Sequence, residues 1–144
     1  HSHGVILFPM NLPTISVVET FILSLEETIS GLQILWGTGK PTRSFLYVED
    51  FARGLIEITE KYAVNDAVNL GTDEEISIKD LVLLIVELSG KKVAVTYDTA
   101  KPDGQPRRNC DVTKLSAKVG FKSRYSLRDG LKKTIEYYTN EYIR

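Results

Sequence analysis

The sequence lacks several residues on which common kinds of protein chemistry depend. Its 144 residues include one cysteine, Cys110, and two histidines, His1 and His3, both within the first three positions. A single cysteine excludes an intramolecular disulfide framework. The opening His-Ser-His-Gly is typical of an affinity-tag remnant, and without it no histidine is left for a catalytic triad, a zinc site or a general base of the usual kind.

Charge of one sign and long hydrophobic runs are also missing. Lys and Arg number 18 against 19 Asp and Glu, which gives a formal net charge of −1, whereas a nucleic-acid-binding domain is expected to be basic. The longest apolar runs, residues 5–8 and 81–86, are far shorter than the roughly 20 residues that span a bilayer. We therefore expect neither a nucleic-acid nor a membrane partner. The lone free cysteine is typical of the reducing cytoplasm.

The sequence that remains has the composition of one globular domain, with 42% hydrophobic residues. Chains of this length can bury about two-thirds of their unfolded surface in a single core. Hydrophobic spacing and caps predict helices over residues 15–30, 50–62, 78–89, 112–118 and 127–142. Short β-like runs are expected at residues 32–36, 45–48, 67–70 and 92–97, and a polar loop at 98–109.

The expected fold class is therefore a small mixed α/β lobe with more helix than strand. No strand–turn–helix carries G-x-G-x-x-G, which a doubly wound dinucleotide-binding domain requires. We accordingly assign no catalytic, cofactor-binding or metal-binding residue. Cys110, without a histidine to activate it, is interpreted as a partly buried small residue rather than a nucleophile.

The sharpest local feature is residues 36–43, Trp-Gly-Thr-Gly-Lys-Pro-Thr-Arg. Gly37 and Gly39 permit a tight turn and a close approach of the backbone to a ligand, and Arg43 offers a planar donor fork that matches phosphate oxygens. A solvated surface hairpin explains the same composition equally well. A P-loop is excluded because Pro41, rather than Ser or Thr, follows Lys40.

A second polar segment, residues 101–108, reads Lys-Pro-Asp-Gly-Gln-Pro-Arg-Arg. A solvated loop is the simplest interpretation, although a stiff loop rich in cations is also suited to clamping a diphosphate. Tyr97 and Lys101 match the Tyr-x-x-x-Lys spacing of short-chain dehydrogenases. That spacing needs one helix face, and Tyr97 ends a predicted strand while Pro102 disfavours helix at Lys101, so the match is attributed to chance.

Four spaced segments together resemble one family. They are residues 36–50, residues 69–72 with 76–79, residues 98–108 with 111–115, and residues 130–137. In this order they resemble the C-terminal half of NAD(P)-dependent sugar-nucleotide epimerases and dehydratases, which are extended short-chain dehydrogenases. Within that family the Lys-Pro-Asp-Gly loop is most similar to that of GDP-L-fucose synthases, which act on GDP-4-keto-6-deoxy-mannose.

The resemblance implies a lobe that binds a nucleotide diphosphate sugar. It carries a substrate-binding role over to Trp36, Arg43 and Lys101, and more weakly to Arg107. The chemistry of these residues agrees, because Arg43 and Lys101 would neutralise a diphosphate and Trp36 would supply an aromatic wall. A UDP-, CDP- or dTDP-sugar in place of a GDP-sugar remains an alternative.

The resemblance also implies what lies elsewhere. The family's Rossmann domain, with its NADP(H) or NAD site and its catalytic Ser, Tyr and Lys, has no counterpart in this sequence. We therefore expect residues 15–144 to form the sugar-nucleotide-binding C-terminal domain of an enzyme, catalytically incomplete by itself, with residues 1–14 a tag remnant or atypical N-terminal segment. The alternative is a non-catalytic binding or interaction module whose exposed apolar face favours self-association.

Overall fold

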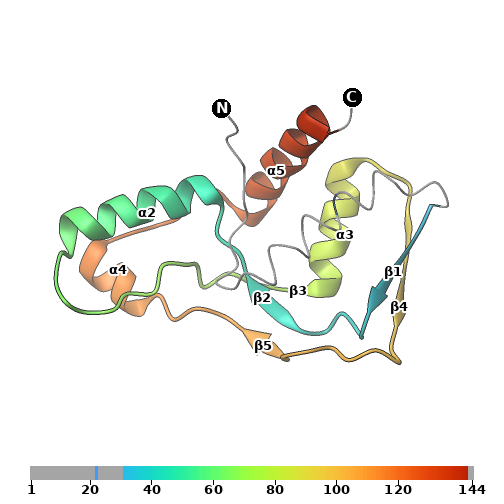
Figure 1. Ribbon diagram of the computed structural model, residues 1–144, viewed down its shortest axis with the longest axis horizontal. Coiled ribbons are helices and arrows are strands. Elements are labelled where there is room, and N and C mark those ends of the chain that lie inside the picture. The colour runs from blue at the N-terminus through green and yellow to red at the C-terminus, as the bar shows by residue number, and fades with distance from the viewer. Residues whose placement is uncertain (1–21, 23–30, 143–144) are drawn as a thin grey trace.

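The computed structural model describes Ile22 and residues 31–142 (Figure 1). Both the helix expected over residues 15–30 and the segment 1–14 lie outside that part of the chain, apart from Ile22. The elements are β1 (Leu32–Trp36), β2 (Thr42–Ser44), α2 (Val48–Lys61), β3 (Glu75–Ser77), α3 (Ile78–Ser89), β4 (Ala94–Asp98), β5 (Arg107–Arg108), α4 (Thr113–Val119) and α5 (Leu127–Tyr142). The expected mixed α/β class with more helix than strand is confirmed.

The strands form two small sheets. β1 pairs in parallel with β4, with Leu32 opposite Ala94 and Trp36 opposite Asp98. β2 is the central strand of the other sheet, antiparallel to β3 and parallel to β5. The predicted strand at residues 32–36 is thus confirmed, the one at 92–97 begins and ends slightly later, and the polar loop expected at 98–109 contains the two-residue strand β5.

Two hydrophobic clusters hold the helices together. The first lies where α3 packs against α5, and includes Leu81, Ile85 and Leu131. The second lies between α2 and α4, and includes Leu115 and Val119. Figure 1 shows the result as an elongated molecule, with α2 and α4 at one end and β1 and β4 at the other.

Residues 45–47 join the two clusters, and the strand predicted at 45–48 is wrong. The strand in this part of the chain is instead the preceding polar segment β2, whose backbone pairs with β3 and β5. Phe45 and Tyr47 point into the first cluster and Leu46 into the second, before α2 begins at Val48. Leu46 makes one isolated β-bridge, and the alternating side chains reflect burial between two cores rather than a continuous strand.

The second error concerns residues 67–70, which form no strand in the described structure. Leu70 is instead buried in the second cluster, where its methyl groups leave no room for a side chain at Gly54 of α2. The side-chain amide of Asn69 donates to the carbonyl of Asp111, 3.1 Å away. The apolar pattern at 67–70 therefore anchors a connection to α2 and α4 instead of joining a sheet.

The helix boundaries follow the predicted caps closely. Ser77 Oγ accepts a hydrogen bond from the Asp80 amide at 3.0 Å at the start of α3, and Gly90 ends that helix with a φ of 68°. Ser126 Oγ accepts from the Asp129 amide at 3.1 Å at the start of α5. Each hydroxyl thus satisfies a helix amide that has no partner within the helix, which confirms the N-cap half of both predicted capping boxes.

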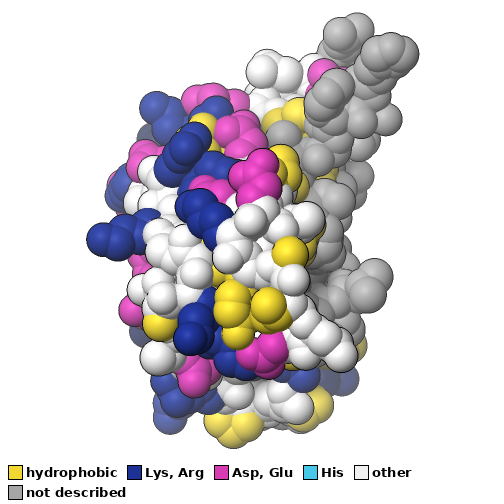
Figure 2. Space-filling view, turned by 90° about the vertical axis from the view of Figure 1, so that its left-hand side faces the viewer, with side chains coloured by type: hydrophobic (Ala, Val, Ile, Leu, Met, Phe, Trp, Pro, Cys, Tyr) yellow, Lys and Arg dark blue, Asp and Glu magenta, His cyan; other side chains and the backbone are white. Residues whose placement is uncertain are grey.

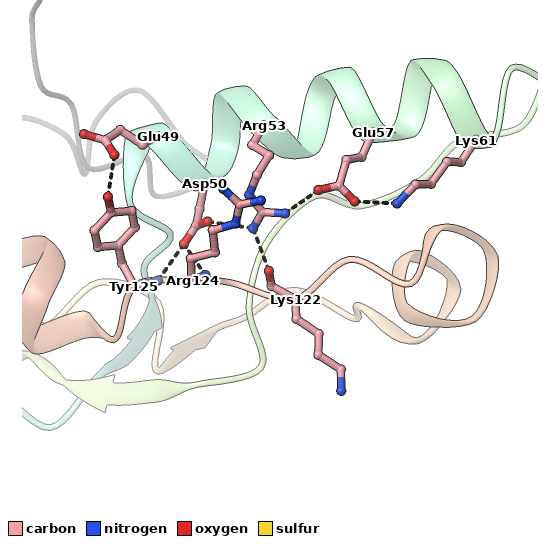
Figure 3. A network of polar contacts seen from close by, with 8 residues as sticks. All are labelled: Glu49, Asp50, Arg53, Glu57, Lys61, Lys122, Arg124 and Tyr125. Atoms are coloured by element: carbon pink, nitrogen blue, oxygen red, sulfur yellow. Dashed lines mark hydrogen bonds and ion pairs between the residues drawn. The ribbon is translucent and has the colours of Figure 1, made fainter.

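A buried carboxylate ties α2 to the segment before α5 (Figure 3). Asp50 is fully buried, and its Oδ2 accepts from the backbone amides of Arg124 at 2.8 Å and Tyr125 at 3.0 Å. Its Oδ1 accepts from Arg53 Nη2 at 2.7 Å, and the same nitrogen reaches the carbonyl of Lys122 at 2.6 Å. Burial of this carboxylate is tolerated because both of its oxygens accept hydrogen bonds from the protein.

The surface at the α2 and α4 end mixes both signs of charge. Figure 2 shows Lys and Arg side chains interspersed with Asp and Glu, around a small hydrophobic patch. Within residues 31–142, no helix is long and apolar enough to cross a membrane. The described residues also hold no group of three or more potential metal ligands.

Candidate functional site

Two loops run alongside each other between the two sheets. Residues 37–41 connect β1 to β2, and residues 99–106 connect β4 to β5. At one end of the loops Trp36 is paired with Asp98, and at the other Thr42 is paired with Arg107. Because both strand pairs are parallel, the two loops run in the same direction from the β1–β4 pair to the β2–β5 pair (Figure 1). The two motifs found in the sequence thus become neighbours in space.

The loops are joined at their middle by Thr38 and Asp103. The Thr38 amide donates to Asp103 Oδ1, and its hydroxyl donates to Asp103 Oδ2 at 2.7 Å. These two hydrogen bonds hold the pKa of the Asp103 carboxyl below its usual value. We call this contact the Thr38–Asp103 clamp.

Trp36 and Lys101 come together at the β1–β4 end of the loops. The Trp36 side chain is largely exposed, at 72%. Lys101 Nζ lies over its ring, 5.4 Å from the centroid, in a cation–π arrangement. The Lys101 amide also donates to the Asp98 carbonyl at 3.1 Å, which fixes the start of the second loop. An aromatic face and an ammonium group are therefore presented together.

Arg43 lies at the β2–β5 end of the loops, in register with Arg108. Partial burial, and secondarily the charge of Arg108, lower the pKa of the Arg43 guanidinium. Its Nη1 donates to the carbonyl of Thr42 at 2.7 Å. Among the described residues, no carboxylate lies within ion-pairing distance of Arg43 or of Lys101. A half-buried cation next to a second cation favours binding of an anion.

Arg107 differs from the other candidate residues because a carboxylate already engages it. Its Nε lies 3.1 and 3.0 Å from the two oxygens of Glu75 in β3, and its Nη2 contacts the same carboxylate. Thr42 Oγ1 and Asn109 Nδ2 donate to Glu75 as well, at 3.0 and 2.9 Å. Together with Arg107 they hold the pKa of Glu75 below its usual value. Arg107 thus links β5 to β3 across β2.

The first loop is also fixed to the beginning of α3. The amides of Ile78 and Lys79 donate to the carbonyls of Pro41 and Gly39, each at 2.9 Å. Gly39 has a φ of +71°, and a Cβ there would lie 2.7 Å from Cε1 of Tyr97. Only glycine fits this conformation and this contact. The helix amides at these positions already have backbone partners, so they do not form an anion site.

The structure brings together Trp36 with Lys101, and Arg43 with the strand that carries Arg107. Sequence reasoning missed three residues that organise this arrangement, namely Thr38, Asp103 and Glu75. Thr38 and Asp103 are 65 positions apart, and nothing in their spacing predicts contact. Glu75 gave no signal either, since an isolated glutamate beside a turn is ordinary surface composition.

Two negative expectations can be compared with the structure. Tyr97 belongs to β4 and Lys101 follows it in a turn, so the pair does not share a helix face and its spacing is indeed a chance match. Cys110 is buried, with its Sγ 3.0 Å from where a Cβ on Gly71 would lie. Burial raises the pKa of the Cys110 thiol, which disfavours the nucleophilic thiolate.

The glycine turn between β1 and β2 does not have the arrangement of a dinucleotide-binding turn. A pyrophosphate in a doubly wound fold binds where a glycine-rich turn opens a helix. The turn at Gly37 and Gly39 leads instead into the three-residue strand β2. We therefore assign no step of cofactor chemistry to these residues.

A family model described as GDP-mannose 4,6 dehydratase matches residues 6–134. A putative GDP-L-fucose synthase 2 of Arabidopsis thaliana is 39% identical over 110 residues, which cover 76% of this chain and 33% of the relative.

Two crystal structures show the same fold. The UDP-glucose 4-epimerase of Thermotoga maritima, solved with UDP-glucose, has a TM-score of 0.76 at 28% identity over 86% of this chain and 39% of its own. A GDP-L-fucose synthetase of Naegleria fowleri, bound to NADP, has a TM-score of 0.80 at 23% identity over 88% of this chain and 40% of its own. The chain thus spans about a third of the length of the curated relatives it matches.

Proposed function

The chain belongs to the GDP-mannose 4,6 dehydratase family, and we propose that residues 15–144 bind and orient a nucleotide diphosphate sugar, with a GDP-sugar as the preferred ligand. The observation that carries the proposal is the placement of Arg43 in β2 and Lys101 beside Trp36, at the two ends of the adjoining loops, with no carboxylate paired to either cation among the described residues.

The roles of these residues follow from their chemistry. Arg43 would contact diphosphate oxygens through its planar fork, which gives both charge and direction to the bond. Lys101 would add a second, compact charge, and Trp36 a flat apolar wall for a sugar or base. Arg107 has the smallest role in the proposal, because it would have to release the Glu75 carboxylate before it could bind a phosphate.

The proposal assigns chemistry to a second lobe. GDP-4-keto-6-deoxy-mannose would be the substrate of the assembled epimerase-reductase, and NADP(H) or NAD would supply the hydride from that lobe. This chain would hold the substrate in place, which is a large part of catalysis even without a reacting side chain. We propose a cytoplasmic location, in keeping with the free thiol of Cys110.

The deciding experiment is a calorimetric titration of the purified chain with GDP. We expect Arg43→Ala to weaken binding by a factor of about ten or more, because a charge-assisted bidentate contact is lost. Lys101→Ala should weaken it about tenfold, and Arg107→Ala by less than either. Arg128→Ala is the matched control, since Arg128 is an exposed arginine on α5 that pairs with Glu87.

The outcomes separate the candidate functions. Failure of the chain to bind any nucleoside diphosphate would overturn the proposal and leave a non-catalytic interaction module as the better interpretation. NADPH-dependent reduction of GDP-4-keto-6-deoxy-mannose by the chain alone would contradict the assignment of chemistry to a second lobe.

A uridine nucleotide is the second candidate ligand. It is favoured by the similarity to the Thermotoga maritima epimerase, whose structure contains UDP-glucose. Titrations with UDP, CDP and dTDP beside GDP distinguish the possibilities, because the diphosphate contacts are common to all four and only the base and ribose contacts differ.

We propose that exposed apolar residues on α2 contribute to association of the chain with the second lobe or with another copy of itself. Leu55 and Ile56 are adjacent in that helix and are 49% and 59% exposed. Exposed apolar neighbours of this kind favour association. We expect sedimentation to show weak self-association of the chain, reduced by Leu55→Ser with Ile56→Ser. A clean monomer at high concentration would count against this part of the proposal.

A further inference from the structure

We propose that Asp103 is a positioning residue for nucleotide binding: the Thr38–Asp103 clamp fixes the separation of the two loops, and thereby the placement of Lys101 over Trp36. The inference rests on the proposed function, because it concerns the same site. It adds a residue that does not itself touch the ligand but determines where two ligand-binding groups lie.

The clamp lies between the groups it would position. Thr38 follows Trp36 by two residues, and Asp103 follows Lys101 by two residues. The clamp therefore joins the two loops at positions that are each two residues beyond a proposed ligand-binding side chain. Both oxygens of the Asp103 carboxylate are used, one by the Thr38 amide and one by the hydroxyl at 2.7 Å. Two bonds from one residue fix orientation as well as distance.

Gly37 supplies an independent sign that the backbone is adapted to the clamp. It adopts a φ of +82°, and a Cβ at this position would overlap Oδ1 of Asp103 and lie 3.1 Å from its Cα. The Gly37 amide donates to the Asp98 carbonyl at 2.9 Å, which aligns the first loop with the end of β4. The absence of a side chain at Gly37 thus lets the two loops approach closely enough for the carboxylate to bind.

A purely structural role explains the clamp less well. Asp103 is exposed and makes no contribution to either hydrophobic cluster. Water can replace an exposed hydrogen bond with little loss of folding stability. Trp36 ends β1 opposite Asp98, and the Lys101 amide also bonds to Asp98, but the side chain of Lys101 reaches the Trp36 ring from the second loop, whose course beyond that point the clamp fixes. A preorganised site avoids the cost of ordering these loops when ligand binds.

The test compares loop variants in GDP titrations of the full chain. We expect Asp103→Ala to weaken GDP binding about tenfold and Thr38→Val about threefold, while Thr38→Ser, which keeps the hydroxyl, stays within about twofold. The double variant of Asp103→Ala and Thr38→Val should bind no more weakly than Asp103→Ala alone, because both changes break one contact.

Asp111→Ala is the matched control. Asp111 also accepts bonds from the amide and hydroxyl of a threonine, Thr113, but the two residues are neighbours at the start of α4. Its loss removes a similar contact without separating two loops. We therefore expect Asp111→Ala to leave GDP affinity unchanged.

Trp36 provides a readout that needs no ligand, because it is the only tryptophan in the chain. Release of the clamp should increase acrylamide quenching of Trp36 and lower its fluorescence anisotropy in Asp103→Ala, with no change in Asp111→Ala. Circular dichroism and urea unfolding would establish that each variant is folded. Thr38→Val tests the same contact if Asp103→Ala fails to fold.

The outcomes distinguish the two proposals. If the unmodified chain binds GDP or another nucleoside diphosphate and both Asp103→Ala and Thr38→Val match it in affinity and quenching, the positioning role is overturned and the proposed function stands. If the unmodified chain binds none of the four diphosphates, the proposed function is overturned and the positioning role with it. Loss of affinity together with increased quenching of Trp36 supports both.

Discussion

Asp50 and Asp103 do similar chemistry in two different regions of the molecule. Each carboxylate accepts backbone hydrogen bonds from a distant part of the chain, Asp50 from Arg124 and Tyr125, and Asp103 from Thr38. Asp50 is fully buried between α2 and the segment before α5, whereas Asp103 is exposed between two surface loops.

The difference in burial decides what each contact does. Around Asp50, whose side chain is almost fully buried, removal of the carboxylate leaves the two amides and the partly buried Arg53 guanidinium without their shared partner, so part of their desolvation is left uncompensated. Around Asp103, water takes the place of the carboxylate with little loss of free energy of unfolding. The same kind of contact therefore stabilises the fold in one region and sets the geometry of a candidate site in the other.

The largest expected effect comes from Asp50→Ala. We expect the free energy of unfolding to fall by about 3–5 kcal/mol, the range found when one partner of a buried ion pair is removed. Urea denaturation measures it directly. Asp66→Ala is the control, because the Asp66–Lys114 pair is about half exposed and its loss should be hard to detect. Equal losses in the two variants would refute the contrast between buried and exposed carboxylates.

Gly37→Ala should have the next largest effect, on stability and binding together. A left-handed φ costs an alanine about 1 kcal/mol, and here the added methyl group would also displace Asp103. Gly120→Ala is the matched control, since Gly120 has a φ of +70° and open space around it. We expect Gly37→Ala to be destabilised by about 1 kcal/mol more than Gly120→Ala and to lose GDP affinity, which Gly120→Ala retains. Thermal unfolding and calorimetry would check both expectations.

Glu75→Gln should produce a smaller change in GDP affinity, and in the opposite direction, since this substitution should strengthen binding. The substitution removes a negative charge close to Arg43 and releases the Arg107 guanidinium from its ion pair. We expect GDP binding to become about two- to threefold tighter; the change is small because exposed ion pairs contribute little energy. A titration beside Glu87→Gln, which breaks the exposed pair with Arg128 on α5, would reveal whether the gain is local. Weaker GDP binding would contradict this expectation and would mean that Arg107 supports the site only by pairing with Glu75.

The smallest effect is expected in the pH dependence of Trp36 fluorescence. Hydrogen bonds from Thr38, and secondarily the charge of Lys40, lower the pKa of Asp103. A lowered pKa in the folded state means that the clamp is complete above the ordinary aspartate pKa and is lost as pH falls through the lowered value. Quenching of Trp36 should thus be constant near neutrality and rise only in acid.

Asp103→Asn separates this step from other effects of acid on the chain. The variant should lack the acid transition attributed to the clamp. A transition of the same size in Asp103→Asn would assign it to another group.

Local signals in the sequence were sufficient for most of the helices. The Ser-x-x-Asp pattern at Ser77 and Ser126 specified two helix starts, and Gly90 and Gly120 specified two helix ends, because capping depends on residues only three or four positions apart. The apolar runs at residues 45–47 and 67–70 were misassigned because strand pairing depends on a partner elsewhere in the chain. Residues 45–47 and Leu70 are buried although none of them belongs to a continuous strand.

The candidate site divides in the same way. The sequence by itself determined which residues could bind an anion or an aromatic group, since Trp36, Arg43 and Lys101 are recognisable by side-chain chemistry and by their motifs. Only the tertiary structure decided that Arg107 is occupied by Glu75, and that Thr38 and Asp103 join the two loops. Contacts between residues 65 positions apart depend on the register of β1 with β4 and of β2 with β5, which no local pattern encodes.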